Sequence, residues 1–273
     1  MAVLPEASPV KIPVARGLRA LGEPLLDVSG LSKRFPTGKQ ALDSVCLQVH
    51  PGDLAVVLGA NGSGKSTLLR CCVRLIDPTA GSVRVSGHDL AHLDGAALRE
   101  ARMAVAMIFQ QANLVRRCSA LANVVMGTLG RHSDMGSKLG LLPREEYEHA
   151  MACLGRVGLP HVAEQRADTL SGGQAQRVAI ARGLSQRPRV LLADEPVASL
   201  DPEAAQDVMA LLRLLAEEER LGIVCVLHQP ALALRFGHRI LGLRDGRVVF
   251  DRSAEDVTGD HIAQLYRADV EAA

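Results

Sequence analysis

The sequence predicts an α/β fold with a mixed central sheet, an antiparallel β subdomain and an α-helical subdomain. Three observations support this prediction: short apolar runs that each stop at a polar residue or glycine, alternating apolar segments at both ends of the core, and a helical middle third. With 273 residues and 48% hydrophobic content, the chain is long enough to bury a sizeable core.

The apolar runs predict parallel central strands, because strands buried on both faces read as continuous apolar segments. They are Ala55 to Leu58 before Gly59, Val190 to Ala193 before Asp194, and Ile223 to Leu227 before His228. In open α/β sheets, ligands bind beyond the carboxyl ends of such strands. We therefore expect Gly59, Asp194 and His228 to converge at one edge of the sheet.

Alternating apolar residues predict antiparallel strands at both ends of the core. The first region runs from about Leu25 to Val85. In the second, Ile240 to Leu243 and Val248 to Phe250 flank Asp245-Gly246, a dipeptide that favours tight hairpin turns. The two regions supply the antiparallel part of the predicted fold.

The middle third, about Asp89 to Leu170, predicts the helical subdomain. Strand alternation is absent after Phe109, and a helical pattern runs from Pro143 to a stop at Gly158. One face of that helix is expected to carry Tyr147, Met151 and Leu154.

A further helix is predicted over residues 202–218. Asp201 is its expected cap and Pro202 occupies the first helical position, where proline is tolerated. Its expected buried stripe is Val208, Leu211, Leu212 and Leu215.

Composition and charge exclude several classes of protein. Thirty-one basic and thirty acidic side chains nearly cancel, so there is no bulk field that would attract nucleic acid or anionic lipid. Two Tyr, four Phe and no Trp leave little material for base stacking, and no nucleic-acid partner is expected. Six cysteines without CxxC or Cys/His metal spacing indicate reduced thiols and neither a zinc site nor a disulfide framework.

The sequence contains no apolar run close to the roughly 20 residues of a membrane-spanning helix. Its N-terminus is interrupted by Pro5, Pro9 and Pro13 and lacks the apolar centre of a signal peptide. We expect a cytoplasmic protein whose attachment to a membrane comes through a partner.

The segment GANGSGKST matches the P-loop pattern G-x-x-x-x-G-K-[ST], follows a predicted strand and precedes the helical run Leu68 to Leu75. Glycines let backbone N–H groups cradle phosphate oxygens, the lysine reaches the β- and γ-phosphates, and the serine offers its hydroxyl to Mg²⁺. The alternative is a merely structural glycine turn. The expected nucleotide-binding residues are Gly59, Ala60, Asn61, Gly62, Ser63, Gly64, Lys65, Ser66 and Thr67.

The segment VLLADEP, Val190 to Pro196, delivers two adjacent carboxylates at the end of a predicted strand, as a Walker B strand does. Asp194 is expected to hold Mg²⁺, directly or through water. Glu195 is expected to orient and deprotonate the water that attacks the γ-phosphate. Taken alone, the pair is equally consistent with a helix cap or a solvated acidic end.

The segment LSGGQ begins a predicted helix that runs to about Gln186, with a serine as N-cap and two glycines that expose backbone donors. It predicts a second phosphate site formed by Ser171, Gly172, Gly173 and Gln174. The alternative is an ordinary helix start. One ATPase chain has no evident need for two γ-phosphate cradles.

An ordered set of motifs resembles the nucleotide-binding subunits of ABC transporters, over about Leu25 to Phe250. The set is GANGSGKST, IFQQ (Ile108 to Gln111), LSGGQ, LLADEP, ASLD (Ala198 to Asp201) and VLHQ (Val226 to Gln229). The resemblance implies a P-loop NTPase of the ABC cassette type over residues 25–255, with a flexible leader at 1–24 and a tail at 256–273. It also implies a head-to-tail dimer in which each ATP lies between one P-loop and the other copy's LSGGQ.

The resemblance assigns roles where positions match. Gln110 is similar to the glutamine that senses Mg²⁺ and the γ-phosphate and links to the membrane partner, and His228 is similar to the switch histidine on the γ-phosphate. Phe35, in LSKRF, is similar to the aromatic residue that stacks on adenine. The alternatives are a satisfied structural histidine and an ordinary core phenylalanine. Ala60 stands where many relatives have proline.

The sequence around these motifs resembles the ATP-binding subunits of phosphonate importers. The segments that carry the resemblance are IFQQANLVRRCSALANVVMGTLGR, LADEPVASLDPE and LHQPALALRFGHRILGLRDGRVVFD. This implies a peripheral ATPase pair on the cytoplasmic face of the inner membrane, docked on two permease subunits and fed indirectly by a solute-binding protein. Residues Asn113 to Leu129 are a candidate docking groove or else a solvated helix. Importers of phosphite or of another small solute, and an ATPase attached to a soluble phosphonate-degrading complex, remain alternatives.

Overall fold

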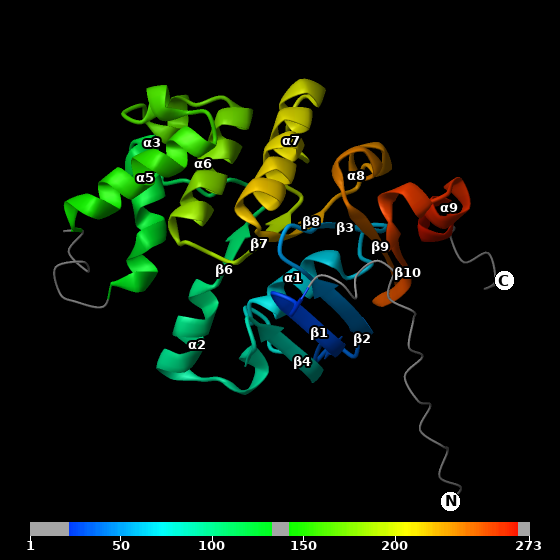
Figure 1. Cartoon of the computed structure of the whole chain (residues 1–273). Helices are drawn as coiled ribbons and strands as arrows, with labels where there is room; N and C mark the ends of the chain where they lie inside the picture. Colours follow the sequence, from blue (N-terminus) through cyan, green and yellow to red (C-terminus); the bar gives the residue numbers. More distant parts are fainter. Residues whose placement is uncertain (1–21, 133–141, 267–273) are drawn as a thin grey trace, which may run out of the picture.

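A computed structural model describes residues 22–132 and 142–266 (Figure 1). The strands are β1 Leu26–Arg34, β2 Gln40–Val49, β3 Leu54–Leu58, β4 Ala80–Val85, β5 His88–Asp89, β6 Val105–Ile108, β7 Val190–Asp194, β8 Gly222–Val226, β9 Arg239–Arg244 and β10 Arg247–Ser253. The α-helices are α1 Lys65–Cys72, α2 Gly95–Met103, α3 Ala120–Val125, α5 Arg144–Arg156, α6 Gly172–Ser185, α7 Pro202–Glu219, α8 Pro230–Phe236 and α9 Gly259–Tyr266. Short 3₁₀ helices are η2 Leu90–His92, η3 Met126–Arg131, η4 Pro160–Val162, η5 Ala167–Thr169 and η6 Ala254–Asp256. Most of the expected leader, 1–24, lies outside the described residues, as does the end of the expected tail.

A six-stranded sheet in the order β10-β9-β3-β8-β7-β6 forms the centre of the molecule. Strands β3, β6, β7, β8 and β9 run parallel to their neighbours, and only β10 pairs antiparallel, with β9. The predicted parallel strands and the predicted hairpin are confirmed. Because Leu58, Asp194 and Val226 end parallel strands of one sheet, the residues that follow them emerge at the same edge.

The second sheet is four-stranded and antiparallel, in the order β2-β1-β4-β5, as the alternation between Leu25 and Val85 predicts. Helix α1 lies between the two sheets and contacts β2 on one side and β7 on the other (Figure 1). The mixed sheet, the antiparallel sheet and the helices confirm the predicted fold class.

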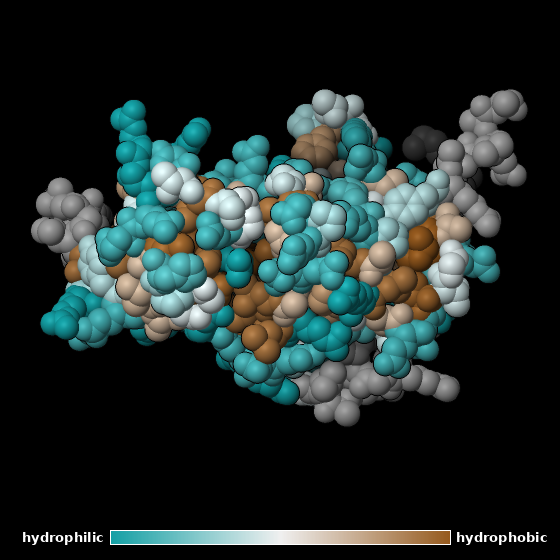
Figure 2. All heavy atoms as spheres, turned by 90° about the horizontal axis from the view of Figure 1, so that it is seen from above, coloured by the Kyte–Doolittle hydropathy of each residue, from teal (hydrophilic) through white to brown (hydrophobic). Residues whose placement is uncertain are grey.

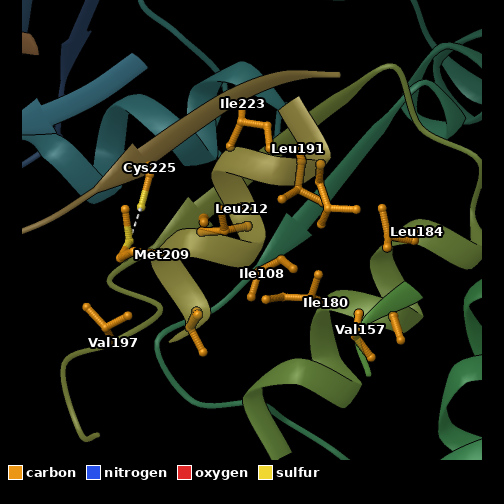
Figure 3. Packing of buried hydrophobic residues seen from close by; sticks show 14 of the residues in the cluster. Ile108, Val157, Ile180, Leu184, Leu191, Val197, Met209, Leu212, Ile223 and Cys225 are labelled. Carbon is orange, nitrogen blue, oxygen red and sulfur yellow. Dashed lines mark hydrogen bonds between the residues drawn. The ribbon is translucent and has the colours of Figure 1, made fainter. Parts of the chain in front are cut away.

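The central sheet is buried on both faces, which explains its continuous apolar strands. Along β3, Val56 and Leu58 pack into a large core beneath α5, α6 and α7, whereas Ala55 and Val57 pack toward α1 and the antiparallel sheet. In the large core, side chains of α7 lie over those of β7 and β8 (Figure 3). Labelled there are Met209 and Leu212 of α7, Leu191 of β7, and Ile223 and Cys225 of β8.

The buried face agrees with the sequence-based prediction in α7 and differs from it in α5. In α7 the cap is confirmed, since the Asp201 carboxylate accepts hydrogen bonds from the backbone N–H groups of Glu203 and Ala204. Its stripe is nearly as predicted, with Leu211 only half-buried.

In α5 the predicted face is wrong as a packing face. Leu154 is buried, but Tyr147 is 40% and Met151 37% exposed, and Ala150 and Cys153 pack against the core instead. The packing face is therefore rotated from the face that the larger side chains suggest.

No helix within the described ranges is long and apolar enough to span a bilayer. Figure 2 shows the molecule from above the view of Figure 1, on the side of the upper ends of α7 and α8. Hydrophilic side chains surround smaller apolar areas on this face. Singly exposed apolar side chains are normal on protein surfaces.

Candidate functional site

The P-loop connects the end of β3 to α1, and close backbone contacts require glycine at two of its positions. A Cβ on Gly59 would lie 2.1 Å from the carbonyl oxygen of Leu243, and one on Gly64 would lie 2.4 Å from that of Ala41. Gly64 also has φ +107°, in the left-handed region that favours glycine. The loop therefore rests directly on β9 and β2, and its position is fixed by two strands distant in sequence.

Lys65 begins α1 and points back into the loop. Its Nζ donates hydrogen bonds of 2.9 Å to the carbonyl oxygens of both Gly59 and Ala60. Burial lowers the pKa of Lys65, and the neighbouring carboxylates of Glu195 and Asp194 oppose that shift. The ammonium group is thus held within the loop, next to two acidic side chains.

Asp194 and Ser66 form the second pair at this edge. The Ser66 hydroxyl donates a 2.9 Å hydrogen bond to Oδ1 of Asp194, which is 5% exposed at the end of β7. Burial raises the pKa of Asp194, while the hydrogen bond from Ser66 lowers it. The convergence expected of the P-loop and the β7 strand end is confirmed by this contact.

Glu195 and His228 form the third pair. Nε2 of His228 lies 2.5 Å from Oε1 of Glu195, and both side chains are only partly exposed. Glu195 has φ +52°, a left-handed conformation that is rare for a non-glycine residue and typical of functional sites. Its backbone N–H donates to the carbonyl of Val226 at the end of β8, which ties the two strand ends together.

Gln110 follows β6 and lies at the same edge of the sheet. This strand runs parallel beside β7 with Ile108 opposite Ala193, so Gln110 emerges near Asp194. Its side chain is exposed, and none of the hydrogen bonds within residues 22–132 and 142–266 joins it to Asp194 or Ser66.

Phe35 lies just beyond the end of β1, half-buried and outside both hydrophobic cores. The Nζ of Lys33 lies 5.3 Å from its ring centroid. The alternative of an ordinary core phenylalanine is therefore wrong. No hydrogen bond in the described part of the chain joins Phe35 to the P-loop.

The LSGGQ segment caps α6 and lies beside the ASLD segment, since a Cβ on Gly172 would be 3.3 Å from Cδ2 of Leu200. Ser171 and Gln174 form a reciprocal capping box, in which the Ser171 hydroxyl accepts from the Gln174 N–H at 3.2 Å and the Gln174 side chain accepts from the Ser171 N–H at 3.0 Å. Ser171 and Gly172 are exposed, and Gly173 lies against Ala204 of α7. Helix α6 packs against α3, α5 and α7, whereas α1 packs against β2 and β7.

One supporting contact was missed by sequence reasoning. The Asp245-Gly246 turn was recognised as a hairpin, but the N–H of Gly246 also donates a 2.9 Å hydrogen bond to the carbonyl of Ser63 in the P-loop. A Cβ on Gly246 would lie 2.7 Å from the carbonyl of Ala41. The close approach of the hairpin turn to the P-loop and to β2 is visible only in three dimensions.

Comparison with known proteins gives consistent matches. Residues 42–198 match the family described as "ABC transporter". The chain is 51% identical over 88% of its length to the phosphonates import ATP-binding protein PhnC of Frankia casuarinae, of which 94% is covered. It is 52% identical over 87% of its length to the phosphate-import ATP-binding protein PhnC of Mycolicibacterium smegmatis, of which 90% is covered.

Among solved structures, the chain is similar to the dimeric ATP-binding cassette MJ0796 in a post-hydrolysis state bound to ADP and Pi. The TM-score is 0.73 at 34% identity, and the match covers 84% of this chain and 98% of the other. Fold and sequence thus agree on the same kind of molecule.

Proposed function

This chain belongs to the ABC transporter family, and from that premise we propose that its ATPase activity drives the import of phosphonates across the cytoplasmic membrane. The observation that supports the ATPase is the meeting of three motifs at one sheet edge, through the Ser66–Asp194 and Glu195–His228 contacts. The observation that supports the solute is the group of relatives named for phosphonate import, at 44 to 51% identity over about nine-tenths of the chain.

In the proposed mechanism, the backbone N–H groups of the P-loop and Lys65 bind the β- and γ-phosphates of ATP. Glu195 accepts a proton from the attacking water, because its carboxylate lies beside the metal-binding pair without belonging to it. His228 holds Glu195 and contacts the γ-phosphate. Phe35 stacks on the adenine from the end of β1.

Mg²⁺ fits the oxygen atoms at this edge. The Ser66 hydroxyl and the Asp194 carboxylate are 2.9 Å apart, and such hard oxygen ligands suit this ion. We propose that these two residues hold Mg²⁺, with Gln110 as a further ligand at the end of β6. Bound there, the ion supplies positive charge to the phosphate oxygens.

We further propose that Ser171, Gly172, Gly173 and Gln174 complete the ATP site of a second copy, head to tail. Three features support this. Ser171 and Gly172 are exposed at a helix N-terminus, which attracts anions. Helix α6 and the P-loop helix α1 pack against different elements of their own chain. The similar cassette MJ0796 is dimeric with ADP and Pi.

Two permease subunits are the proposed membrane partners, and an open, mainly apolar cleft offers a place for one of their segments. The cleft has a volume of about 320 Å³, and its lining includes Leu75, Met103 and Met107 together with the polar side chains of Arg99, Arg102 and Gln186. Leu75 is 55% exposed, although it is apolar. In the neighbouring segment Asn113 to Leu129, the apolar side of α3 is buried. The large apolar side chains that this segment exposes are Val115 and Leu129.

The permeases place this subunit on the cytoplasmic face of the inner membrane and link it indirectly to a solute-binding protein. Phosphate import is the second candidate function, because the relative from Mycolicibacterium smegmatis carries that name at 52% identity. The transported solute does not touch the ATPase chemistry, so these residues do not discriminate between the two.

Deletion of the gene, with growth on phosphonate, phosphite or phosphate as sole phosphorus source, tests the solute. We expect loss of growth on phosphonate, restored by the wild-type gene and not by Lys65→Ala. Unimpaired growth on phosphonate without a second importer would refute the proposal, and loss confined to low phosphate would favour phosphate import. Recovery of the chain with soluble phosphonate-degrading enzymes and no membrane protein would refute transport itself.

A further inference from the structure

The segment expected from sequence to be a tail contains α9, which is anchored to the catalytic domain. Leu265 of α9 is 1% exposed and belongs to the same large core as Leu227 and Ile240. The guanidinium of Arg244, at the end of β9, donates a 3.0 Å hydrogen bond to the carbonyl of Gln264. Helix α9 therefore packs on the sheet close to its nucleotide edge (Figure 1).

The last residue of α9 contacts the loop that carries His228. The hydroxyl of Tyr266 lies 3.5 Å from the carbonyl oxygen of His228 and donates to it. Among the hydrogen bonds of residues 22–132 and 142–266, this is the one that the His228 carbonyl receives. The same residue's Nε2 lies 2.5 Å from Oε1 of Glu195.

Among the described residues, the other hydrogen bonds and restraints on the backbone of the His228 loop lie at its two ends. On one side, the Leu227 N–H donates to the carbonyl of Val57 in β3. On the other, Gln229 is the N-cap of α8 and precedes Pro230, which restricts Gln229 to extended backbone. The peptide group between His228 and Gln229 lies between these anchors and belongs to the residue whose imidazole meets Glu195.

We propose that Tyr266 is a positioning residue for His228: its hydroxyl, presented by α9, holds the His228 carbonyl and thereby sets the imidazole against Glu195. This inference rests on the proposed role of His228 in ATP hydrolysis. No hydrogen bond among residues 22–132 and 142–266 joins Tyr266 to the P-loop or to the Ser66–Asp194 pair. Loss of its hydroxyl therefore affects turnover and leaves ATP binding unchanged.

Tyr266→Phe tests this in the full-length chain, because it keeps the ring and removes only the hydroxyl. We expect kcat for ATP hydrolysis to fall about two- to threefold with an unchanged KM, which corresponds to the loss of one long hydrogen bond. The matched control is Tyr147→Phe, which changes the only other tyrosine, 40% exposed against 42% for Tyr266. That control is expected to leave kcat unchanged.

A double-mutant cycle with His228→Ala separates positioning from a merely structural effect. If Tyr266 acts through His228, Tyr266→Phe lowers kcat in the wild-type background and has no further effect on the residual activity of His228→Ala. Equal effects in both backgrounds, or an unchanged kcat in Tyr266→Phe, would overturn the inference. Lys65→Ala run in parallel tests the proposed function, since an active Lys65→Ala variant contradicts the ATPase site and not the Tyr266 contact.

Discussion

The two phosphate-binding motifs of this chain differ in what surrounds them. The P-loop is largely enclosed by its own chain, apart from its exposed tip at Asn61 and Gly62: Gly59 and Gly64 lie against carbonyls of β9 and β2, and Lys65 is 5% exposed. The LSGGQ segment exposes Ser171 and Gly172 at a helix end. The first motif is supported by its own chain, whereas the second is presented outward, as the proposed two-copy site requires.

Loss of Lys65 is the most severe test of the enclosed motif. Lys65→Ala removes the ammonium group that lies between the loop carbonyls and the two carboxylates, so we expect ATP hydrolysis to fall by at least roughly 100-fold and ATP binding to be weakened. ATP titration and a phosphate-release assay measure both. Arg84→Ala, at an exposed position on β4, is the control, and ATPase activity retained by Lys65→Ala removes the P-loop from the mechanism.

Substitution of Glu195 separates binding from hydrolysis. Glu195→Gln keeps the shape of the side chain but removes the base, so hydrolysis should fall about 100- to 10,000-fold while ATP still binds. An ATP-loaded dimer should then accumulate and be visible by size-exclusion chromatography. A Glu195→Gln chain that stays monomeric at saturating ATP counts against the proposed two-copy site.

A mixing experiment compares the two motifs directly. We expect Ser171→Ala to lower hydrolysis about tenfold, because it removes a phosphate contact and a helix cap worth ~1 kcal/mol. A mixture of Ser171→Ala and Lys65→Ala chains forms dimers in which one site has an intact P-loop facing an intact LSGGQ. Its ATPase rate should exceed the average of the two variants, whereas a rate equal to that average would mean that each chain acts alone.

The sequence predicted the enclosed motif well because its signals are local. A strand, a glycine loop and a helix start follow one another between β3 and α1, and the β7 strand ends directly at Asp194 and Glu195. The packing face of α5 was mistaken because side-chain size is a poor guide when neighbouring helices decide which side is covered. Tyr147 and Met151 are the larger residues, yet they remain exposed.

Contacts between distant segments were beyond the reach of the sequence. Two hydrogen bonds depend on how separate elements pack. One runs from the Gly246 N–H to the Ser63 carbonyl, and the other from the Tyr266 hydroxyl to the His228 carbonyl. Their residues form no motif, and a turn or a terminal helix has many possible neighbours. The contacts that support the catalytic edge could therefore be identified only in the structure.

The smallest expected effect concerns the contacts at the end of α6, the helix that begins in LSGGQ. Arg131 donates to the carbonyl of Ser185, at the end of α6, and to the carboxylate of Glu146 in α5, which also contacts His132. Burial alone would raise the pKa of Glu146, but the hydrogen bond with His132 and the charge of Arg131 outweigh it and hold the pKa below its ordinary value of 4.5. The ionised carboxylate thus joins α5 to the helix that carries LSGGQ.

Because the folded-state pKa of Glu146 lies below the unfolded one, its stabilisation is complete above the ordinary value and is lost as the pH falls below about 4.5. Glu146→Gln should lower the melting temperature at pH 7 by about 3 to 6 °C, or roughly 1 to 2 kcal/mol, with the exposed Glu145→Gln as control. The difference from wild type should shrink as the pH falls through the acid range. A difference that is the same at every pH would show that Glu146 stabilises through packing alone, and the outward motif would then not depend on this charge.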